Sequence, residues 1–294
     1  MSHPSKIETG QAYVANGYIS LQGKPAHVVD QYFKNSTTIM FVRDPYERLF
    51  SAWLDKLYNP NVYFWQSLGN KIRGINNEKV CTHNVTFSEF VEYIGKQIES
   101  GKCLDGHFSQ SVQHCDPCRF NYTFIGKYET FKEDTIGIVN ALNLSTVVTL
   151  DNFEEAAADD AINDAATWVF GLKARTTECK VPFWCTLFKT WNRLQSRGII
   201  DMKSKFPFNK TQADFLKQDD FIKSLHAARG TTSDNVLMKN RQLAYQQALM
   251  HLSSHIKVSV NKAFMKDFQL FDYSPAKLLN ISEIDNPLFQ QCTL

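Results

Sequence analysis

The sequence has no hydrophobic run long enough to cross a membrane. Residues 1–20 contain no continuous apolar core, and the apolar run at 181–188 is far short of the roughly 20 residues that a spanning helix needs. We therefore expect neither a signal peptide nor a membrane anchor within this chain. The chain also lacks a strong net charge. Its formal value of +2 does not by itself indicate a polyanionic partner.

No internal repeat or low-complexity tract is visible, and the composition is that of an ordinary globular protein, with 43% hydrophobic and 21% charged residues. We expect a single domain over residues 1–294, with a surface insertion at about 151–240. Six acids and no base occupy 151–164, whereas 171–210 carries nine Lys and Arg residues against two acids. These blocks are interpreted as solvated faces that partly pair with each other; a basic rim for an acidic polymer is the alternative.

The seven cysteines do not show the two closely spaced pairs that are typical of a zinc site. Cys115 and Cys118 form a close pair, but no second pair at metal-ligand spacing accompanies them. No metal is therefore expected. Disulfides that join this pair to Cys81, to Cys103 or to each other are favoured over zinc.

Six Asn-x-Ser/Thr sequons suggest a secretory-pathway lumen, where such sites can be glycosylated. Disulfides would be stable in the same compartment. The sequon asparagines are Asn35, Asn84, Asn121, Asn143, Asn209 and Asn280.

The stretch from Thr37 to Leu57 predicts a strand that runs into an amphipathic helix. Residues 36–43 are rich in Thr, Ile, Phe and Val, which is typical of a strand buried on both faces of a parallel sheet. Asp44 is expected to cap the helix, with Pro45 as its first residue. Helical spacing then places one set of side chains in the core, namely Tyr46, Leu49, Phe50, Trp53, Leu54, Leu57 and Tyr58.

Further elements suggest the fold class. Thr86 and Glu89 predict a capping box at the start of a second helix, and Gly101 is a plausible end for it. A strand is expected at 121–129, followed by a helix from Phe131. This order of elements predicts an α/β fold with a mainly parallel central sheet flanked by helices.

Arg43 and Ser51 raise the question of an anion site. A helix start offers unpaired N–H groups and the positive end of the helix dipole, and an arginine can give a forked contact to phosphate. Spacing alone leaves the alternative open that Arg43 pairs with Glu47 or Asp44 while Ser51 faces water.

Four stretches in order carry a family resemblance. "FVRDPYERLFSAW" resembles the 3′-phosphate motif of the Golgi carbohydrate sulfotransferases, the group that includes chondroitin, dermatan and HNK-1 sulfotransferases. "VTFSEFVEYI", "DGHFSQSVQHCDPCRFNYTFIGKYET" and "DFQLFDY" are similar to later blocks of that family, with Asp272 where glycine is usual.

The resemblance implies a P-loop-like sulfotransferase fold and a sulfate donor, 3′-phosphoadenosine-5′-phosphosulfate (PAPS). It implies that Arg43 and Ser51 bind the donor's 3′-phosphate and that His107 is the catalytic base. His114 is a weaker candidate for the base, and Glu129 is expected to be structural. The acceptor would be a hydroxyl of a glycan or proteoglycan, such as a chondroitin, dermatan or N-acetylgalactosamine-containing chain.

The chain also departs from the family pattern. Only 42 residues precede Arg43, and none forms the loop that binds the 5′-phosphosulfate, so we expect that loop, the first strand and the membrane anchor to be missing from an N-terminally truncated chain. The resemblance implies the lumenal side of the Golgi membrane, with membrane association only through the absent anchor. The alternative is a catalytically inactive, sulfotransferase-like Golgi binding protein.

A nucleic-acid binder built on 171–210 is a third hypothesis, because aromatic residues interleave with the basic ones there. Helical spacing explains the same aromatic residues as the buried side of a helix. We prefer that interpretation and expect no nucleic-acid partner.

Overall fold

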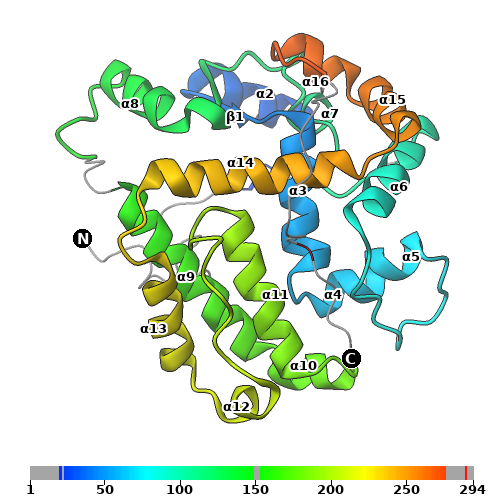
Figure 1. Cartoon of the computed structure of the whole chain (residues 1–294). Coiled ribbons are helices and arrows are strands. Elements are labelled where there is room, and N and C mark those ends of the chain that lie inside the picture. Colours follow the sequence, from blue (N-terminus) through cyan, green and yellow to red (C-terminus); the bar gives the residue numbers. More distant parts are fainter. Residues whose placement is uncertain (1–19, 22, 103, 149–152, 276–288, 290–294) are drawn as a thin grey trace. The chain divides into compact units, whose positions relative to one another are not determined.

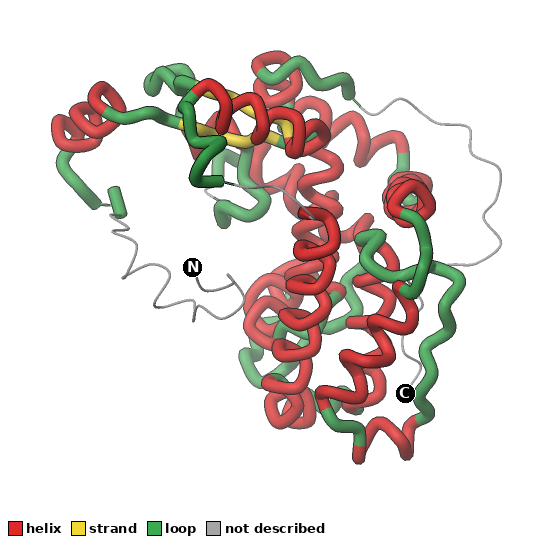
Figure 2. Tube along the Cα trace, turned by 90° about the vertical axis from the view of Figure 1, so that its left-hand side faces the viewer, coloured by secondary structure: helices red, strands yellow, loops and turns green. Residues whose placement is uncertain are grey.

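A small parallel sheet forms where the sequence predicts two strands. The computed structural model describes residues 20–21, 23–102, 104–148, 153–275 and 289. In it, β1 (Ile39–Val42) pairs in parallel with β2 (Phe124–Lys127), and Figure 2 shows the two strands side by side. The rest is mostly helical, so the fold is a helix-rich α/β fold with a small parallel sheet.

Residue contacts divide the chain into two units. The first comprises residues 1–42 and 111–153, and the second comprises 43–110 and 154–294. Besides the sheet, the first unit holds the helices α2 (Ala26–Asn35), α7 (Ser111–Cys115) and α8 (Phe131–Ala141). The helices of the second unit are α3 (Pro45–Trp53), α4 (Val62–Phe64), α5 (Asn70–Ile72), α6 (Phe87–Glu99), α9 (Phe153–Gly171, whose first residue falls in the first unit), α10 (Lys173–Glu178), α11 (Phe183–Ser196), α12 (Lys210–Phe215), α13 (Gln218–Arg229), α14 (Asp234–Met250), α15 (Ser254–Ala263) and α16 (Met265–Leu270).

Strand β1 is half-buried, so the expectation of burial on both faces is wrong. Met40 and Val42 are buried, whereas Ile39 and Phe41 are exposed by 43% and 36%. Alternation of this kind is typical of a sheet with one covered face. The ring of Phe41 lies directly over Gly126 of β2, where an added Cβ would come within 2.4 Å of it, so only glycine fits there without a shift.

Helix α3 begins as predicted. The Asp44 carboxylate accepts a hydrogen bond from the backbone N–H of Glu47 at 3.0 Å, and Pro45 is the first helical residue. After Trp53 the helix widens into a π-helical turn, Leu54–Tyr58. All seven apolar side chains predicted for the core are buried, which confirms the predicted face.

The main core of the second unit joins helices that are distant in sequence. Helix α14 crosses α3 (Figure 1), and α15 packs along α6. The predicted capping box of Thr86 and Glu89 is confirmed at the start of α6. Gly101 has a φ of 70° just beyond the end of that helix, as expected for a glycine stop.

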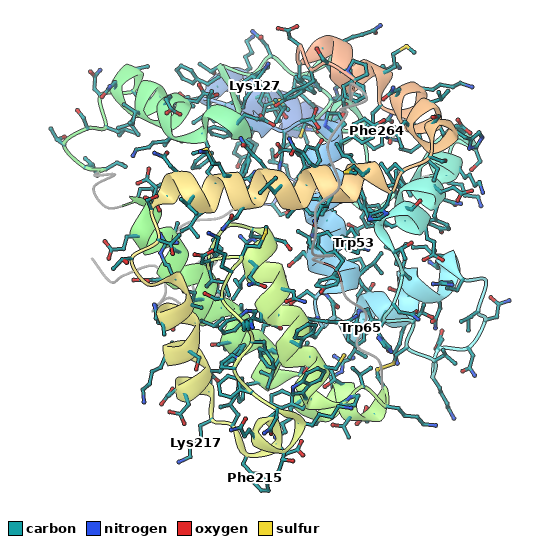
Figure 3. The ribbon with its side chains drawn as sticks, viewed as in Figure 1. Trp53, Trp65, Lys127, Phe215, Lys217 and Phe264 are labelled. Atoms are coloured by element: carbon teal, nitrogen blue, oxygen red, sulfur yellow. A yellow bond between two sulfur atoms is a disulfide. The ribbon has the colours of Figure 1, made fainter. Side chains whose placement is uncertain are left out.

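The segment expected to be a surface insertion has a hydrophobic core of its own. Ile162 of α9, Leu187 and Trp191 of α11, and Phe221 of α13 are all buried together. Segment 151–240 is thus not mostly superficial, although its assignment as an insertion stays a prediction. The buried aromatic side of α11 favours the structural interpretation of its aromatic residues over a stacking platform. In the same region, Phe215 at the end of α12 points outward and is 83% exposed (Figure 3).

The predicted disulfide partners are wrong. Cys81 pairs with Cys179, just after α10, with a Cα–Cα distance of 5.5 Å. Cys185 is also disulfide-bonded, whereas Cys115 and Cys118 are thiols. Cys103 lies outside the described residues. Sequence spacing did not reveal this pairing, because it depends on how α10 packs beside the loop that carries Cys81.

Candidate functional site

The three predicted site residues line one cavity of about 280 Å³ within the second unit. Arg43 lies between the end of β1 and the Asp44 cap of α3, Ser51 lies on α3, and His107 lies in the loop before α7. The structure thus brings together residues more than 50 positions apart in sequence. The other lining residues are Arg48, Ala52, Leu54, Asp55, Lys56, Arg193 and Arg197.

Arg43 is held in place by an acidic neighbour. Its guanidinium donates to Oε2 of Glu47, at 3.0 Å from Nη2 and 3.3 Å from Nε. Arg241 of α14 donates to the same oxygen at 3.1 Å. The alternative pairing of Arg43 with Glu47 is therefore present, and it coexists with the place of Arg43 on the cavity wall. One carboxylate oxygen thus accepts hydrogen bonds from two guanidinium groups.

Arg48 fixes the loop that carries His107. From α3, its guanidinium donates to the carbonyl of Gly106 at 2.6 Å and to the carbonyl of Ser109. Two charge-assisted hydrogen bonds to carbonyls on either side of His107 hold the loop against the helix. Arg48 thus has a structural function in addition to its charge.

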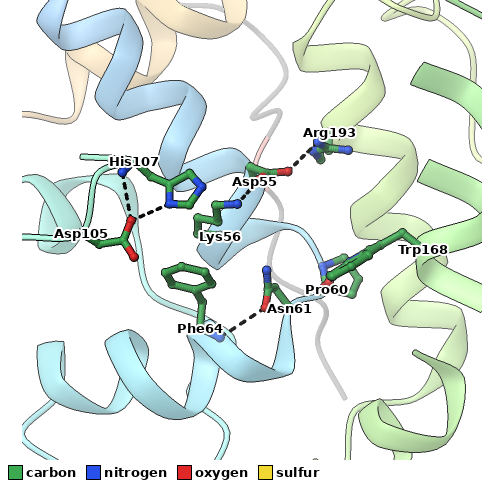
Figure 4. A network of polar contacts seen from close by, with 9 residues as sticks. All are labelled: Asp55, Lys56, Pro60, Asn61, Phe64, Asp105, His107, Trp168 and Arg193. Carbon is green, nitrogen blue, oxygen red and sulfur yellow. Dashed lines mark hydrogen bonds and ion pairs between the residues drawn. The ribbon is translucent and has the colours of Figure 1, made fainter. Parts of the chain in front are cut away.

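His107 and Asp105 form a hydrogen-bonded pair. Nδ1 of His107 lies 2.5 Å from Oδ1 of Asp105, which also accepts the backbone N–H of His107 at 2.9 Å (Figure 4). Burial raises the pKa of the Asp105 carboxyl, but the hydrogen bonds from His107 and the charges of His107 and Lys56 outweigh it, so that pKa lies below its usual value. An ionised carboxylate on Nδ1 favours the tautomer in which Nε2 can accept a proton.

The cavity wall also carries a charge network of Asp55, Lys56 and Arg193 that we did not predict from the sequence. Asp55 accepts from Nη2 of Arg193 at 2.7 Å and from Nζ of Lys56 at 2.8 Å (Figure 4). Burial raises the pKa of Asp55, yet the charges of Arg193, Lys56 and Arg197 bring it below the usual value. Burial, followed by repulsion from Arg197, lowers the pKa of Arg193 to about 10, so Arg193 remains charged at neutral pH.

The cavity is strongly cationic. Five of its ten lining residues are Lys or Arg, one is His, and only Asp55 is acidic. A concave wall lined by one sign of charge focuses the field and attracts an ion of the opposite sign. An anionic ligand is the chemistry that this arrangement fits best.

Two other residues of the motif stretches belong to the first unit: His114, the weaker candidate for the base, and Glu129, which was expected to be structural. His114 lies in α7, and Glu129 lies in the 3-10 turn Tyr128–Thr130, where it is exposed. Neither is among the residues that line the cavity. In the part of the chain that the structure describes, no group of three or more His, Cys, Asp or Glu side chains could hold a metal ion.

The chain is similar to known proteins of one family. Residues 5–180 match the sulfotransferase family. The chain is 31% identical to human carbohydrate sulfotransferase 9 over 137 residues, which cover 44% of this chain and 30% of that protein. It is 35% identical to Xenopus laevis carbohydrate sulfotransferase 12 over 133 residues, which cover 41% and 32% of the two chains.

A third similar protein is carbohydrate sulfotransferase 11 of Rattus norvegicus, with 28% identity over 152 residues, or 49% of this chain and 43% of that protein. The chain thus matches less than half the length of these three relatives. No solved structure matches significantly.

Proposed function

The chain belongs to the sulfotransferase family, and from this premise we propose that it transfers a sulfuryl group from PAPS to a glycan hydroxyl. The observation that carries the proposal is the cationic cavity, which unites Arg43, Ser51 and His107. The similar carbohydrate sulfotransferases support a saccharide acceptor. A chondroitin, dermatan or other N-acetylgalactosamine-containing chain is the acceptor class that we propose.

In this proposal, Arg43 and Ser51 bind the 3′-phosphate of the donor. The Arg43 guanidinium and the positive end of the α3 dipole stabilise the negative charge, and the Ser51 hydroxyl adds a neutral donor. This role is supported by the fact that both side chains line the same cavity.

His107 would act as the base. Its Nε2 accepts the proton of the acceptor hydroxyl while the hydroxyl oxygen bonds to the sulfur, and the bond from sulfur to the oxygen of the 5′-phosphate breaks. The products are a sulfated glycan and 3′,5′-adenosine bisphosphate. Asp105 holds the ring and stabilises the imidazolium, and the cations of the wall stabilise charge on the leaving phosphate.

We also propose that the parallel pair β1–β2 belongs to the P-loop-like sheet of the sulfotransferase fold. Strands β1 and β2 are parallel and helices lie between them in the chain, as is usual in an α/β fold, which supports this proposal. Our expectation that the 5′-phosphosulfate loop is missing from this chain stays a prediction.

A Golgi lumenal location is proposed on chemical grounds. The Cys81–Cys179 disulfide fits an oxidising compartment. The sequon asparagines Asn35, Asn84, Asn121, Asn143 and Asn209 are all exposed, as glycosylation requires, and Asn280 lies outside the described residues. Within the described ranges, no helix combines the length and apolar character needed to cross a membrane.

Nucleotide binding tests the proposal most directly. We expect 3′,5′-adenosine bisphosphate to raise the melting temperature of the protein, and Arg43→Ala to abolish that rise because the guanidinium that grips the phosphate is lost. Arg175→Ala, at an exposed arginine outside the cavity, is the matched control and should respond like the unmodified protein. An equal response in Arg43→Ala would remove Arg43 from the site.

Turnover tests the second half of the proposal. Transfer of radioactive sulfate from PAPS to desulfated chondroitin and dermatan should be detectable once an upstream segment that carries the 5′-phosphosulfate loop is restored to the chain. His107→Ala should lower it by roughly a hundredfold or more, the usual contribution of a general base. Full turnover in that variant would eliminate His107 as the base.

A further inference from the structure

Helix α14 contacts the residue that orients Arg43. Arg241 of this helix donates from Nη2 to Oε2 of Glu47 at 3.1 Å, and Arg43 donates to the same oxygen from Nη2 and Nε at 3.0 Å and 3.3 Å. Arg241 is not among the residues that line the cavity. It also follows residue 180, where the match to the sulfotransferase family ends. Glu47 therefore connects a cavity residue to a helix that the family match does not cover.

We propose that Arg241 is a positioning residue, which fixes the carboxylate of Glu47 and, through it, the guanidinium of Arg43 in the orientation that binds the 3′-phosphate. The inference rests on the proposed function and adds to it a residue that acts on the phosphate site without contacting the ligand. Arg241 would thus help to set the affinity for nucleotides that carry a 3′-phosphate.

The backbone that carries Arg241 is fixed by packing one turn before and one turn after it. Gly198, just beyond α11, has a φ of 67°, and a Cβ added there would come within 2.4 Å of the Leu237 carbonyl oxygen and 3.3 Å of the Arg241 Cβ. At the next turn, the Tyr245 hydroxyl donates to Oδ1 of Asp44, the cap of α3, at 3.4 Å. Arg241 therefore projects from a part of α14 that is anchored to both α11 and α3.

Preorganisation explains how the Arg241 contact can affect binding. The side chains of Arg43 and Glu47 are 17% and 26% exposed, so they have rotamer freedom that a fixed partner restricts. Side chains that must be ordered when a ligand binds lower its affinity. Because Arg241 shares the carboxylate oxygen, a phosphate also competes with Glu47 for Arg43 more easily. Both effects have the same sign, so loss of Arg241 should weaken binding of the 3′-phosphate.

Calorimetric titration of 3′,5′-adenosine bisphosphate into the full chain tests the inference. Arg241→Gln should raise the Kd roughly tenfold, as expected when two further side chains must be ordered on binding. Lys239→Gln is the matched control, because it removes one charge from an exposed position of the same helix, and it should leave the Kd unchanged. The melting temperature of Arg241→Gln without nucleotide should stay close to that of the unmodified protein, because a partly exposed ion pair adds little stability.

A double-mutant cycle with Glu47→Gln separates positioning from other effects of Arg241. Glutamine keeps the shape of the side chain and loses the charge that both arginines share. If Arg241 acts through Glu47, then Arg241→Gln should change the Kd by less than about twofold in the Glu47→Gln background, whatever the Kd of Glu47→Gln itself. A long-range effect of the Arg241 charge, or a direct contact with the nucleotide, would leave the tenfold change in place.

Two results would overturn the inference while the proposed function stands. One is an unchanged Kd in Arg241→Gln, and the other is a tenfold change that persists in the Glu47→Gln background. Failure of the proposed function has a different signature, namely nucleotide binding that is unaffected by Arg43→Ala, and that result would remove both.

Discussion

Lys189 is a buried cation whose removal should stabilise the protein. It is 3% exposed; its Nζ donates to the carbonyl of His83 at 2.5 Å and lies 5.4 and 5.6 Å from the ring centres of Tyr58 and Trp65. Burial lowers the pKa of Lys189 from 10.5 to about 7, because the ammonium loses its hydration in the core. We predict that Lys189→Met raises the free energy of unfolding at pH 7.

The magnitude follows from proton linkage. Between pH 7 and pH 10.5 the unfolded chain keeps the lysine proton that the folded protein has released, so native stability rises with pH across this window. The rise is up to about 1.4 kcal/mol per pH unit and about 5 kcal/mol in total. Below pH 7 both states are protonated, and the full burial cost is present.

Methionine avoids this cost but leaves the His83 carbonyl without its donor, which costs about 1–3 kcal/mol. The net gain at pH 7 is therefore about 1–3 kcal/mol, and it should vanish near pH 9.5, where the native lysine is neutral and most of the linkage penalty is gone. In the unmodified protein, burial and the charge of Lys189 lower the pKa of His83 to about 4, so His83 titrates below this range.

Urea unfolding at pH 7, 8 and 9.5 measures the effect. The unmodified protein should gain stability over this range relative to Lys189→Met, at equal m-values. Lys217→Met is the matched control, because Lys217 is exposed at the surface (Figure 3), and it should leave the pH dependence unchanged. A Lys189→Met protein that is less stable than the unmodified one at every pH would refute the reasoning.

Two further predictions concern the proposed base and the disulfide. Asp105→Asn should lower kcat for sulfate transfer about tenfold or more, because the imidazolium loses its carboxylate, and should leave the Kd of 3′,5′-adenosine bisphosphate unchanged; a change in KM alone would contradict this role. The double variant Cys81→Ala, Cys179→Ala removes a disulfide that joins residues 98 positions apart. Calorimetric or denaturant unfolding should show that the free energy of unfolding falls by about 2–5 kcal/mol. An unchanged transition would mean that the disulfide does not constrain the unfolded chain.

Local signals predicted the elements around α3 well. The cap at Asp44, the following proline and the apolar spacing from Tyr46 to Tyr58 all depend on neighbours within a few turns, and all are confirmed. The strands were found for the same reason. Which faces of β1 are covered depends on distant packing, and there the prediction was wrong.

Only some of the residues that line the candidate site could be predicted from the sequence. Arg43, Ser51 and His107 come from motif stretches, and they line one cavity, although their functions stay predictions. From the sequence, Arg193 and Arg197 could be recognised only as part of the basic block 171–210. They line the cavity because α11 packs against the π-helical turn, and this contact between distant segments could not be predicted. The i,i+4 spacing of two arginines at the end of a helix with one apolar side was the available signal.

The π-helical turn Leu54–Tyr58 has a consequence for how this chain tolerates length changes. A π turn holds about one more residue than an α turn does, and here it lets Leu54 and Leu57 stay in the core while Asp55 and Lys56 reach the cavity wall. Deleting one residue at this point would remove the extra residue that the wide turn accommodates, so regular α winding would return without a change in the phase of the rest of the helix. Orthologues that are one codon shorter here would therefore be expected to keep the helix and its core face and to differ in the side chains that this turn presents to the cavity.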